Sequence, residues 1–247
     1  MKPDPIVTDV YVGARGPFRF LVDTGAETSV INPALAARLG LEPQYRVEQS
    51  TLNGARLVPA VRLSSLRIGS HAIPEVDLLI HDVDTARRLD SAVAGIPGAS
   101  ALAAFDFTLS PSTHELDYNA ARPSFGEAVP FYRVEGRMAV KAQMGAETMT
   151  MVLDSGSTNI VLFRTPAAMA KTRAVRGTMT TIEGARSVVP TVWTADMFFN
   201  GRLRVSMLPA AIVERRPGGS EVHGLLPASV FKKIYVDHGR NELVLIR

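Results

Sequence analysis

One short stretch occurs twice in this chain, and it constrains the fold more than any other feature. Residues 20–31 read FLVDTGAETSVI, and residues 151–162 read MVLDSGSTNIVL. Each copy places Asp-Thr/Ser-Gly between two apolar runs that are typical of buried strands. A carboxylate between such strands is costly to bury unless another group hydrogen-bonds to it or shares its charge. Each copy is therefore predicted to hold an acid group, Asp23 or Asp154, in a tight turn that the glycine permits.

Glycines elsewhere follow nearly the same spacing as the two aspartates. The aspartates are 131 residues apart. Gly54 and Gly184 are 130 residues apart, and Gly95 and Gly224 are 129 residues apart. A period this long does not fit a solenoid, so it predicts an internal duplication that forms two similar lobes. We expect an N-terminal lobe at residues 1–122, a linker rich in Pro and Gly at residues 123–130, and a C-terminal lobe at residues 131–247.

Local patterns predict strands joined by turns, with a few short helices. Residues 10–22 and 46–63 alternate as β-hairpins do, and the second hairpin turns at Asn53-Gly54. A short helix is expected after the Asn-Pro pair at residues 32–33. We expect a surface loop over residues 81–91 and another short helix over residues 94–98.

Composition excludes several classes of protein. Of the 247 residues, 46% are hydrophobic and 21% are charged, as in ordinary globular domains. The absence of cysteine rules out disulfides and thiolate metal sites. No apolar run reaches the roughly 18 residues of a membrane span, and the first residues lack the apolar core of a signal peptide. The compartment is left open, and export to the periplasm or the medium is the expectation if a signal has been removed.

Charge and motif content argue against nucleic acid, metal and serine chemistry. The net charge is +3, and pairs of basic residues are separated by acids without interleaved aromatics, which is typical of solvated faces. The five histidines are scattered without ligand spacing, so neither a metal nor another cofactor is predicted. No Gly-x-Ser-x-Gly motif occurs, which makes a serine hydrolase a poor fit.

Two similar lobes usually pack about a pseudo-twofold axis, and residues near that axis meet their own counterparts. Asp23 and Asp154 would then share one site. Two adjacent carboxylates cannot both ionise cheaply, so one proton is held between them. The ionised partner can take a proton from water while the protonated partner donates one to a carbonyl oxygen.

The residues around the two aspartates resemble those of a known enzyme family. Residues 23–26, Asp-Thr-Gly-Ala, resemble the active-site signature of retropepsins, and residues 154–157, Asp-Ser-Gly-Ser, resemble the pepsin version. The later segments 95–98 and 224–227 resemble the apolar segment that follows in both lobes, so the resemblance covers nearly the whole chain. It implies an all-β acid protease fold, with two pseudo-twofold-related retropepsin-like β-barrel lobes and short helices. Short bacterial single-chain aspartyl proteases look most similar.

The resemblance also implies a role for each residue of the two turns. Asp23 and Asp154 would be the catalytic pair. Thr24 and Ser155 would make crossed hydroxyl-to-backbone hydrogen bonds that lock the turns together. The active-site support would be completed by backbone N–H groups that Gly25 and Gly156 offer to the carboxylates.

Ser157 makes the predicted pair asymmetric. By resemblance, its hydroxyl would donate to the outer oxygen of Asp154, which its counterpart Ala26 cannot do for Asp23. A hydrogen bond to the charged form favours that form. We therefore expect Asp154 to be ionised more often, Asp23 to hold the proton, and activity to peak at mildly acidic pH.

Two hairpin tips are candidates for covering a bound substrate. The turn at Asn53 and Gly54 matches the flap of the family, although no aromatic residue sits at this tip. The turn at Glu183 and Gly184 is either a second flap or an ordinary surface hairpin. Tyr45 lies too far before the first turn to take the place of the flap tyrosine of pepsins.

These observations predict an aspartic endopeptidase that hydrolyses a peptide or protein substrate. The expected state is a monomer, with a homodimer as the alternative. A binding or inhibitory module that keeps the fold without turnover is the competing interpretation, because fold does not imply function. A third is a protein that must dimerise or lose a segment to become active.

Overall fold

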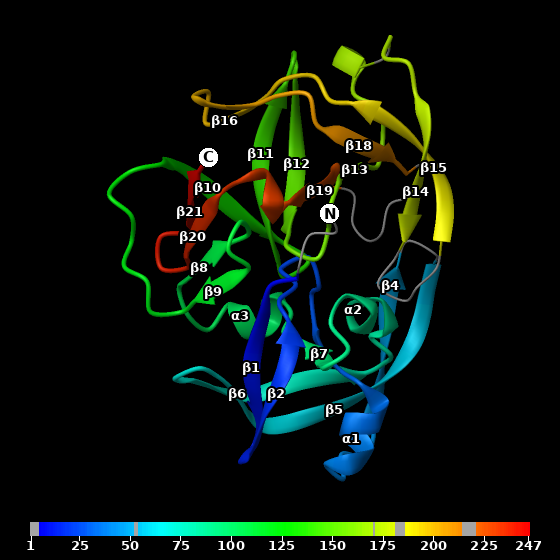
Figure 1. Ribbon diagram of the computed structural model, residues 1–247, viewed down its shortest axis with the longest axis vertical. Helices are drawn as coiled ribbons and strands as arrows, with labels where there is room; N and C mark the ends of the chain where they lie inside the picture. The colour runs from blue at the N-terminus through cyan, green and yellow to red at the C-terminus, as the bar shows by residue number, and fades with distance from the viewer. Residues whose placement is uncertain (1–4, 52–53, 170, 181–185, 214–220) are drawn as a thin grey trace.

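The computed structural model describes residues 5–51, 54–169, 171–180, 186–213 and 221–247. Strands dominate these residues and helices are few and short, so the predicted all-β class is confirmed. In Figure 1 the first half of the chain fills the lower part of the molecule and most of the second half fills the upper part. Strands from both halves meet between them, at the left of the view.

Seven strands form the N-terminal sheet, in the order β1-β2-β7-β3-β6-β5-β4. β1 also pairs with β5, so hydrogen bonds connect six of these strands in a ring. Residues 54–68 form one long strand, which runs from the β4–β5 hairpin to the turn before β6. The strands are β1 (Val7–Val12), β2 (Arg15–Leu21), β3 (Ser29–Ile31), β4 (Tyr45–Thr51), β5 (Gly54–Ile68), β6 (His71–Ile80) and β7 (Val93–Ile96).

The second sheet contains the strands of the second half and two from the first. Its main path runs β14-β15-β18-β13-β19-β12-β11-β10-β21-β20-β8-β9, with β16 and β17 attached at β11. The strands are β8 (Phe107–Ser110), β9 (Glu115–Asp117), β10 (Glu127–Val134), β11 (Arg137–Met144), β12 (Glu147–Asp154), β13 (Ile160–Leu162), β14 (Val175–Thr180), β15 (Arg186–Trp193), β16 (Met197–Phe199), β17 (Leu203–Val205), β18 (Pro209–Ile212), β19 (Gly224–Pro227), β20 (Lys233–Asp237) and β21 (Glu242–Ile246).

Pairings around the two aspartates correspond strand for strand. β2 pairs with β7 in parallel, and β12 pairs with β19 in parallel. β3 runs antiparallel to β7 and parallel to β6, while β13 runs antiparallel to β19 and parallel to β18. The chain therefore enters and leaves Asp23 and Asp154 along the same arrangement of neighbouring strands.

Short helices connect the strands. Asn32 caps the first, accepting a hydrogen bond from the Ala34 N–H at 2.9 Å, and Pro33 is its first residue, as the Asn-Pro pair predicts. The elements are α1 (Pro33–Arg38), α2 (Asp84–Leu89), α3 (Ala99–Leu102) and the 3₁₀ turns η1 (Ala167–Met169) and η2 (Ala228–Val230).

Two local predictions are wrong. The loop expected over residues 81–91 contains α2. The helix expected over residues 94–98 is instead the central strand β7 followed by a bend, and the helix begins only at Ala99. A short apolar run does not distinguish a buried strand from a helix. Here the close packing of Gly95 decides for the strand, because a Cβ on it would lie 2.4 Å from Cε2 of Phe20.

One apolar core runs through both halves. It extends from Val10 and Phe20 to Met151 and Leu245 without a break between the sheets. Residues 123–130, expected as a linker, include the start of β10, and Glu127–Pro130 pair with β21. No helix among the described residues has the length and apolar content needed to cross a membrane.

Candidate active site

The two Asp-Thr/Ser-Gly turns lie at matching places in the sheets. β2 ends two residues before Asp23, and β12 ends at Asp154 itself. The neighbouring parallel strand supports each turn: the Asp23 N–H donates to Pro97 O at 3.4 Å, and Asp154 is paired with Pro227. Both acid groups thus leave the sheet beside the segments that the sequence singled out.

Crossed hydrogen bonds join the two turns. The Thr24 hydroxyl donates to the carbonyl of Leu153 at 2.8 Å and accepts from the Ser155 N–H at 3.1 Å. The Ser155 hydroxyl donates to the carbonyl of Val22 at 2.8 Å and accepts from the Thr24 N–H at 3.0 Å. Because Thr24 is fully buried, these bonds replace water and fix the position of one turn relative to the other.

Backbone N–H groups within each turn hold one oxygen of its carboxylate. Oδ1 of Asp23 accepts from the N–H groups of Gly25 at 2.8 Å and Ala26 at 3.2 Å. Oδ1 of Asp154 accepts from the N–H groups of Gly156 at 2.8 Å and Ser157 at 3.0 Å. The two carboxylates are therefore oriented by equivalent donors.

Each glycine lies against the carboxylate of the opposite turn. A Cβ built on Gly25 would be 2.5 Å from Cγ of Asp154, and one built on Gly156 would be 2.7 Å from Cγ of Asp23. Side-chain atoms do not approach this closely, so only glycine fits at either position. The same contacts place both acid groups together at the junction of the turns.

The two carboxyl groups lie close enough to interact, and each shifts the pKa of the other. Burial raises the pKa of Asp154 well above its ordinary value of 3.8, and the charge of Asp23 raises it further. Burial also raises the pKa of Asp23, while the Gly25 N–H and the Asp154 side chain lower it. Burial therefore favours a pair that retains one proton.

The Ser157 hydroxyl does not make the hydrogen bond on which the asymmetry expected from the sequence depended. The Ser157 hydroxyl donates to the carbonyl of Asn159 at 2.7 Å and not to the Asp154 carboxylate. Its single proton is used within the turn, so Ser157 contacts the Asp154 carboxylate only through its backbone N–H. Asp154 is 8% exposed, and burial is the main cause of its raised pKa.

A comparison of the chain with models of protein families identifies the first of these turns. The aspartyl protease family model matches residues 8–100, which contain Asp23 and the strands that hold it. The match supports the aspartic protease family predicted from the sequence.

The comparisons with solved structures and with curated proteins give weaker or no matches. One solved structure that matches is a retropepsin-like aspartic protease from Rickettsia conorii, with 22% sequence identity. The match covers 43% of this chain and 85% of that chain, with a TM-score of 0.34, and at this score it says nothing further about the chain. The comparison with curated proteins gave no match.

Ser29 is a supporting residue of the Asp23 turn, and the sequence did not reveal its hydrogen-bond partner. It is fully buried, and its hydroxyl accepts a hydrogen bond from the Gly98 N–H at 3.1 Å. The N–H groups of Ala99 and Ser100 in α3 then donate to the carbonyls of Ala26 and Glu27 at 2.7 and 3.0 Å. The sequence does place a hydroxyl within an apolar run at this position, and a buried hydroxyl needs a hydrogen-bond partner.

The hairpin tips are only partly described. Asn53, Glu183 and Gly184 lie outside the described residues. Gly54 begins β5, where it is paired with Thr51 near the tip of the β4–β5 hairpin. The Tyr45 hydroxyl donates to Asp77, so it is engaged at the base of this hairpin and is not directed to a substrate.

The site formed by the two turns offers a limited set of groups for chemistry. It brings together the two carboxyl groups, two hydroxyls and the backbone N–H groups described above. Among the described residues, no group of three or more His, Asp or Glu side chains is placed to hold a metal ion. The arrangement is suited to proton transfer by a carboxyl pair.

Proposed function

We propose that this protein is an aspartic endopeptidase in which Asp23 and Asp154 activate a water molecule. The observation that carries this proposal is the pair of turns joined by crossed hydrogen bonds, with each carboxyl group against the glycine of the other turn. The aspartyl protease family of residues 8–100 supports it. The two lobes predicted from the sequence would each contribute one acid group.

The protonation of the pair sets the order of proton transfers. Ionised Asp23 takes a proton from water as the oxygen attacks the carbonyl carbon of the scissile peptide bond. Protonated Asp154 donates its proton to the carbonyl oxygen, and the product is a neutral tetrahedral diol. The diol collapses when Asp23 gives its proton to the leaving nitrogen, Asp154 takes the proton of one diol hydroxyl, and the C–N bond breaks to release an amine and a carboxylic acid. No covalent enzyme intermediate forms.

The substrate class follows from the shape of the surrounding elements. The β4–β5 and β14–β15 hairpins lie on the same side of the molecule, at the right of Figure 1. Hairpins of this kind can hold an extended peptide as an added strand through backbone hydrogen bonds. We propose a peptide or protein substrate in this mode, bound by a monomer.

A silent peptide-binding module is the second candidate. It is favoured by one observation: the tip of the first hairpin, Asn53-Gly54, has no aromatic residue in its sequence that could contact a substrate. In this case the acid pair would bind a peptide without cleaving it.

Digestion of denatured casein across a pH series separates the two candidates. We expect cleavage by the wild type, and inhibition by a statine peptide that mimics the diol. Asp23→Asn and Asp154→Asn should each lose cleavage while keeping the wild-type fold. Glu75→Gln, which changes a carboxyl group outside the site, is the matched control and should cleave normally.

The outcomes are distinct. Statine binding without cleavage at any pH would establish the silent module. Cleavage that survives in either Asn variant would refute the acid-pair mechanism.

A further inference from the structure

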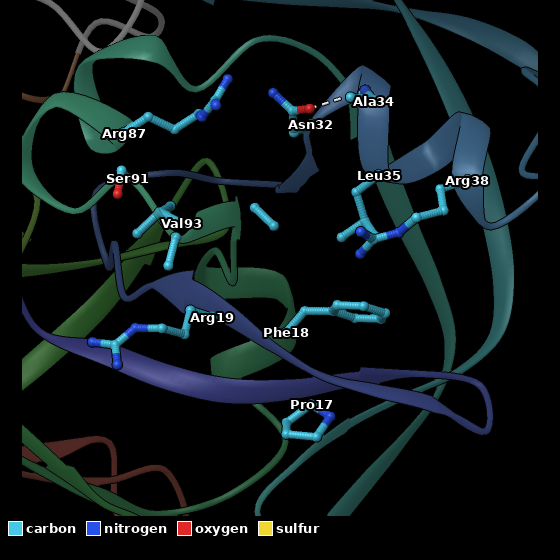
Figure 2. Close-up of a pocket in the computed structure, with 12 residues that line it drawn as sticks. Pro17, Phe18, Arg19, Asn32, Ala34, Leu35, Arg38, Arg87, Ser91 and Val93 are labelled. Carbon is cyan, nitrogen blue, oxygen red and sulfur yellow. Dashed lines mark hydrogen bonds between the residues drawn. The ribbon is translucent and has the colours of Figure 1, made fainter.

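A pocket of about 400 Å³ lies in the first half of the molecule, apart from the aspartate turns. β2, α1 and the segment from α2 to β7 surround it (Figure 2). Its volume lies within the range of small-molecule sites, roughly 300–1,000 Å³. None of its lining residues belongs to the site described above.

Three arginines line this pocket: Arg19, Arg38 and Arg87. Arg19 is bonded to Asp90 at 3.0 Å, and the Arg38 guanidinium lies 5.5 Å from the centre of the Phe18 ring. The Arg87 guanidinium forms no hydrogen bond or ion pair with a described residue, while the Arg87 backbone N–H donates to the carbonyl of Val83. The charge of the lining is therefore positive, with one arginine neutralised by a carboxylate.

Asn32 adds a second donor beside Arg87. It is 6% exposed, and its Oδ1 is occupied by the Ala34 N–H, which fixes the orientation of the amide. Its Nδ2 has no hydrogen-bond partner among the described residues. Figure 2 shows this nitrogen directed away from Ala34 and toward the guanidinium of Arg87. Two donor groups thus face the same space, and an acceptor there would satisfy both.

Apolar side chains form the rest of the lining. Leu35 and Val93 are buried at 5% and 2% exposure, and the Phe18 ring lines the same pocket (Figure 2). Such a surface suits an apolar group and not a free inorganic ion, whose hydration it could not replace. Arginine, in contrast, binds carboxylates and phosphates through a planar set of donors.

We propose that this pocket binds a small organic oxyanion, a carboxylate or phosphate on an apolar body. The oxyanion accepts hydrogen bonds from Arg87 and from Nδ2 of Asn32, and the apolar body lies against Phe18, Leu35 and Val93. This site is additional to the proposed peptidase site and does not depend on it.

Binding can be measured by calorimetry with four probes on the intact protein. Benzoate and phenyl phosphate carry the two oxyanions on the same ring, benzamide lacks the charge, and inorganic phosphate lacks the ring. We expect benzoate, phenyl phosphate or both to bind, and the stronger of the two identifies the natural head group. Benzamide and inorganic phosphate should bind at least tenfold more weakly than that probe.

Three variants test the assigned donors. Arg87→Ala should weaken binding about tenfold or more, because a hydrogen bond to a charged group is lost. Asn32→Asp keeps the cap of α1, since aspartate caps helices as well as asparagine does, but it replaces the donor by a negative charge. It should abolish binding without lowering the melting temperature. Arg88→Ala removes the same charge from the same helix at a residue that does not line the pocket, and it should change affinity less than about twofold.

Three results would refute the proposed oxyanion site. Failure of both aromatic oxyanions to bind the wild type at millimolar concentration would refute the proposal. So would wild-type affinity in Arg87→Ala or folded Asn32→Asp, or equal binding of benzamide.

Discussion

Asp154 is the residue whose environment departs most from what the sequence indicated. Its burial and the nearby charge of Asp23 both favour the protonated form. Burial also raises the pKa of Asp23, while the N–H groups of Gly25 and Ala26 lower it. A pair that keeps one proton and loses the other can both accept and donate a proton, as acid–base chemistry requires.

Asp154→Asn should be more stable than the wild type at neutral pH. The raised pKa means that the folded protein binds more protons than the unfolded chain between pH 3.8 and the folded pKa. The stability of the wild type therefore falls as the pH rises through this interval. The variant lacks this loss, so its advantage in melting temperature should be largest at pH 7 and shrink toward pH 4. An equal difference at both pH values would contradict the raised pKa.

The rate of cleavage should begin to fall on the alkaline side only above pH 3.8, which is the ordinary pKa of aspartate. The active form holds one proton in the pair, and burial delays the loss of that proton as the pH rises. We expect cleavage of a peptide substrate to peak at mildly acidic pH. A profile of kcat/KM that has already fallen at pH 3.8 would contradict this.

Gly25→Ala should abolish cleavage. The added methyl would lie 2.5 Å from Cγ of Asp154, so the two carboxyl groups must separate. Overpacking of this kind usually costs about 1–3 kcal/mol of the free energy of unfolding. Gly239→Ala is a suitable control, because its Cβ would make only an ordinary contact, 3.5 Å from Asp237. Activity in Gly25→Ala equal to that of the control would show that the glycine contact is dispensable.

Asp23, Asp154 and their glycines could be predicted from the sequence because the motif repeats. The Ser157 hydroxyl could not be placed, because its choice between a carboxylate and the Asn159 carbonyl depends on the local turn geometry. The pocket arginines could not be assembled either, since Arg19, Arg38 and Arg87 come from three separate elements.

At the scale of elements, the two turns act as one unit. The hydroxyls of Thr24 and Ser155 each connect a carbonyl and an N–H of the other turn. Neither turn could satisfy these groups alone, so the geometry of each carboxylate depends on both halves of the chain.

Thr24→Val should destabilise the protein by about 1–3 kcal/mol, because it leaves the Leu153 carbonyl and the Ser155 N–H without partners. Ser155→Ala should destabilise the protein by a similar amount, because it leaves the Val22 carbonyl and the Thr24 N–H without partners. The double variant should lose less free energy of unfolding than the sum of the two single losses, since both hydroxyls join the same two turns. Chemical denaturation of the four proteins measures this coupling, and strict additivity would contradict it.

Element prediction succeeded where a turn or cap residue marked a boundary and failed in apolar runs. The hairpins and α1 were indicated by Gly, Asn and Pro. The sequence predicts a helix where β7 lies, because four residues are too few to show whether apolar positions repeat as in a strand or as in a helix. The ladder contacts with β2 and β3 decide its form, and these come from distant parts of the sequence.

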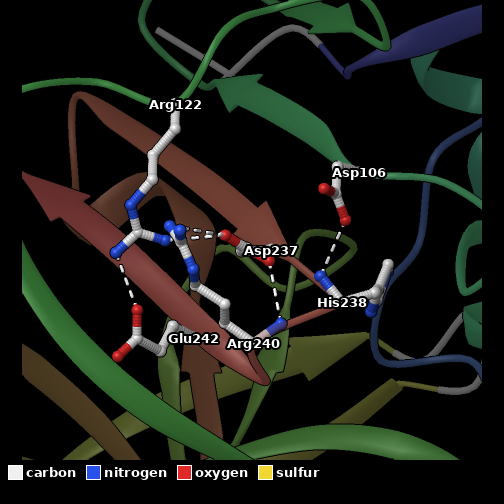
Figure 3. A network of polar contacts seen from close by, with 6 residues as sticks. All are labelled: Asp106, Arg122, Asp237, His238, Arg240 and Glu242. Carbon is white, nitrogen blue, oxygen red and sulfur yellow. Dashed lines mark hydrogen bonds and ion pairs between the residues drawn. The ribbon is translucent and has the colours of Figure 1, made fainter.

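At the scale of the whole molecule, strands of both halves share one sheet. β8 pairs with β20, and β10 pairs with β21 and then continues into β11. Arg122, which precedes β10, bonds to both Asp237 and Glu242 at 2.7 Å (Figure 3). The connection between the halves is thus fixed to the C-terminal hairpin by hydrogen bonds and charge.

Arg122→Ala should lower the free energy of unfolding by about 1–3 kcal/mol, because Asp237 is only 10% exposed and loses a charged partner. Arg122→Lys should recover part of this loss, since an ammonium group cannot reach two carboxylates as a guanidinium does. Arg240→Ala is the matched control. Arg240 is 65% exposed and 3.7 Å from the same carboxylate, so its loss should be within about 0.5 kcal/mol. Equal effects of the two alanine variants would contradict this role of Arg122.

The shared sheet has a consequence for any attempt to divide the protein. A cut between β9 and β10 would separate β8 from β20 and leave each fragment with an exposed strand edge. Such edges recruit other strands. The two fragments, produced together, should complement each other and restore one particle, whereas either fragment produced alone should aggregate.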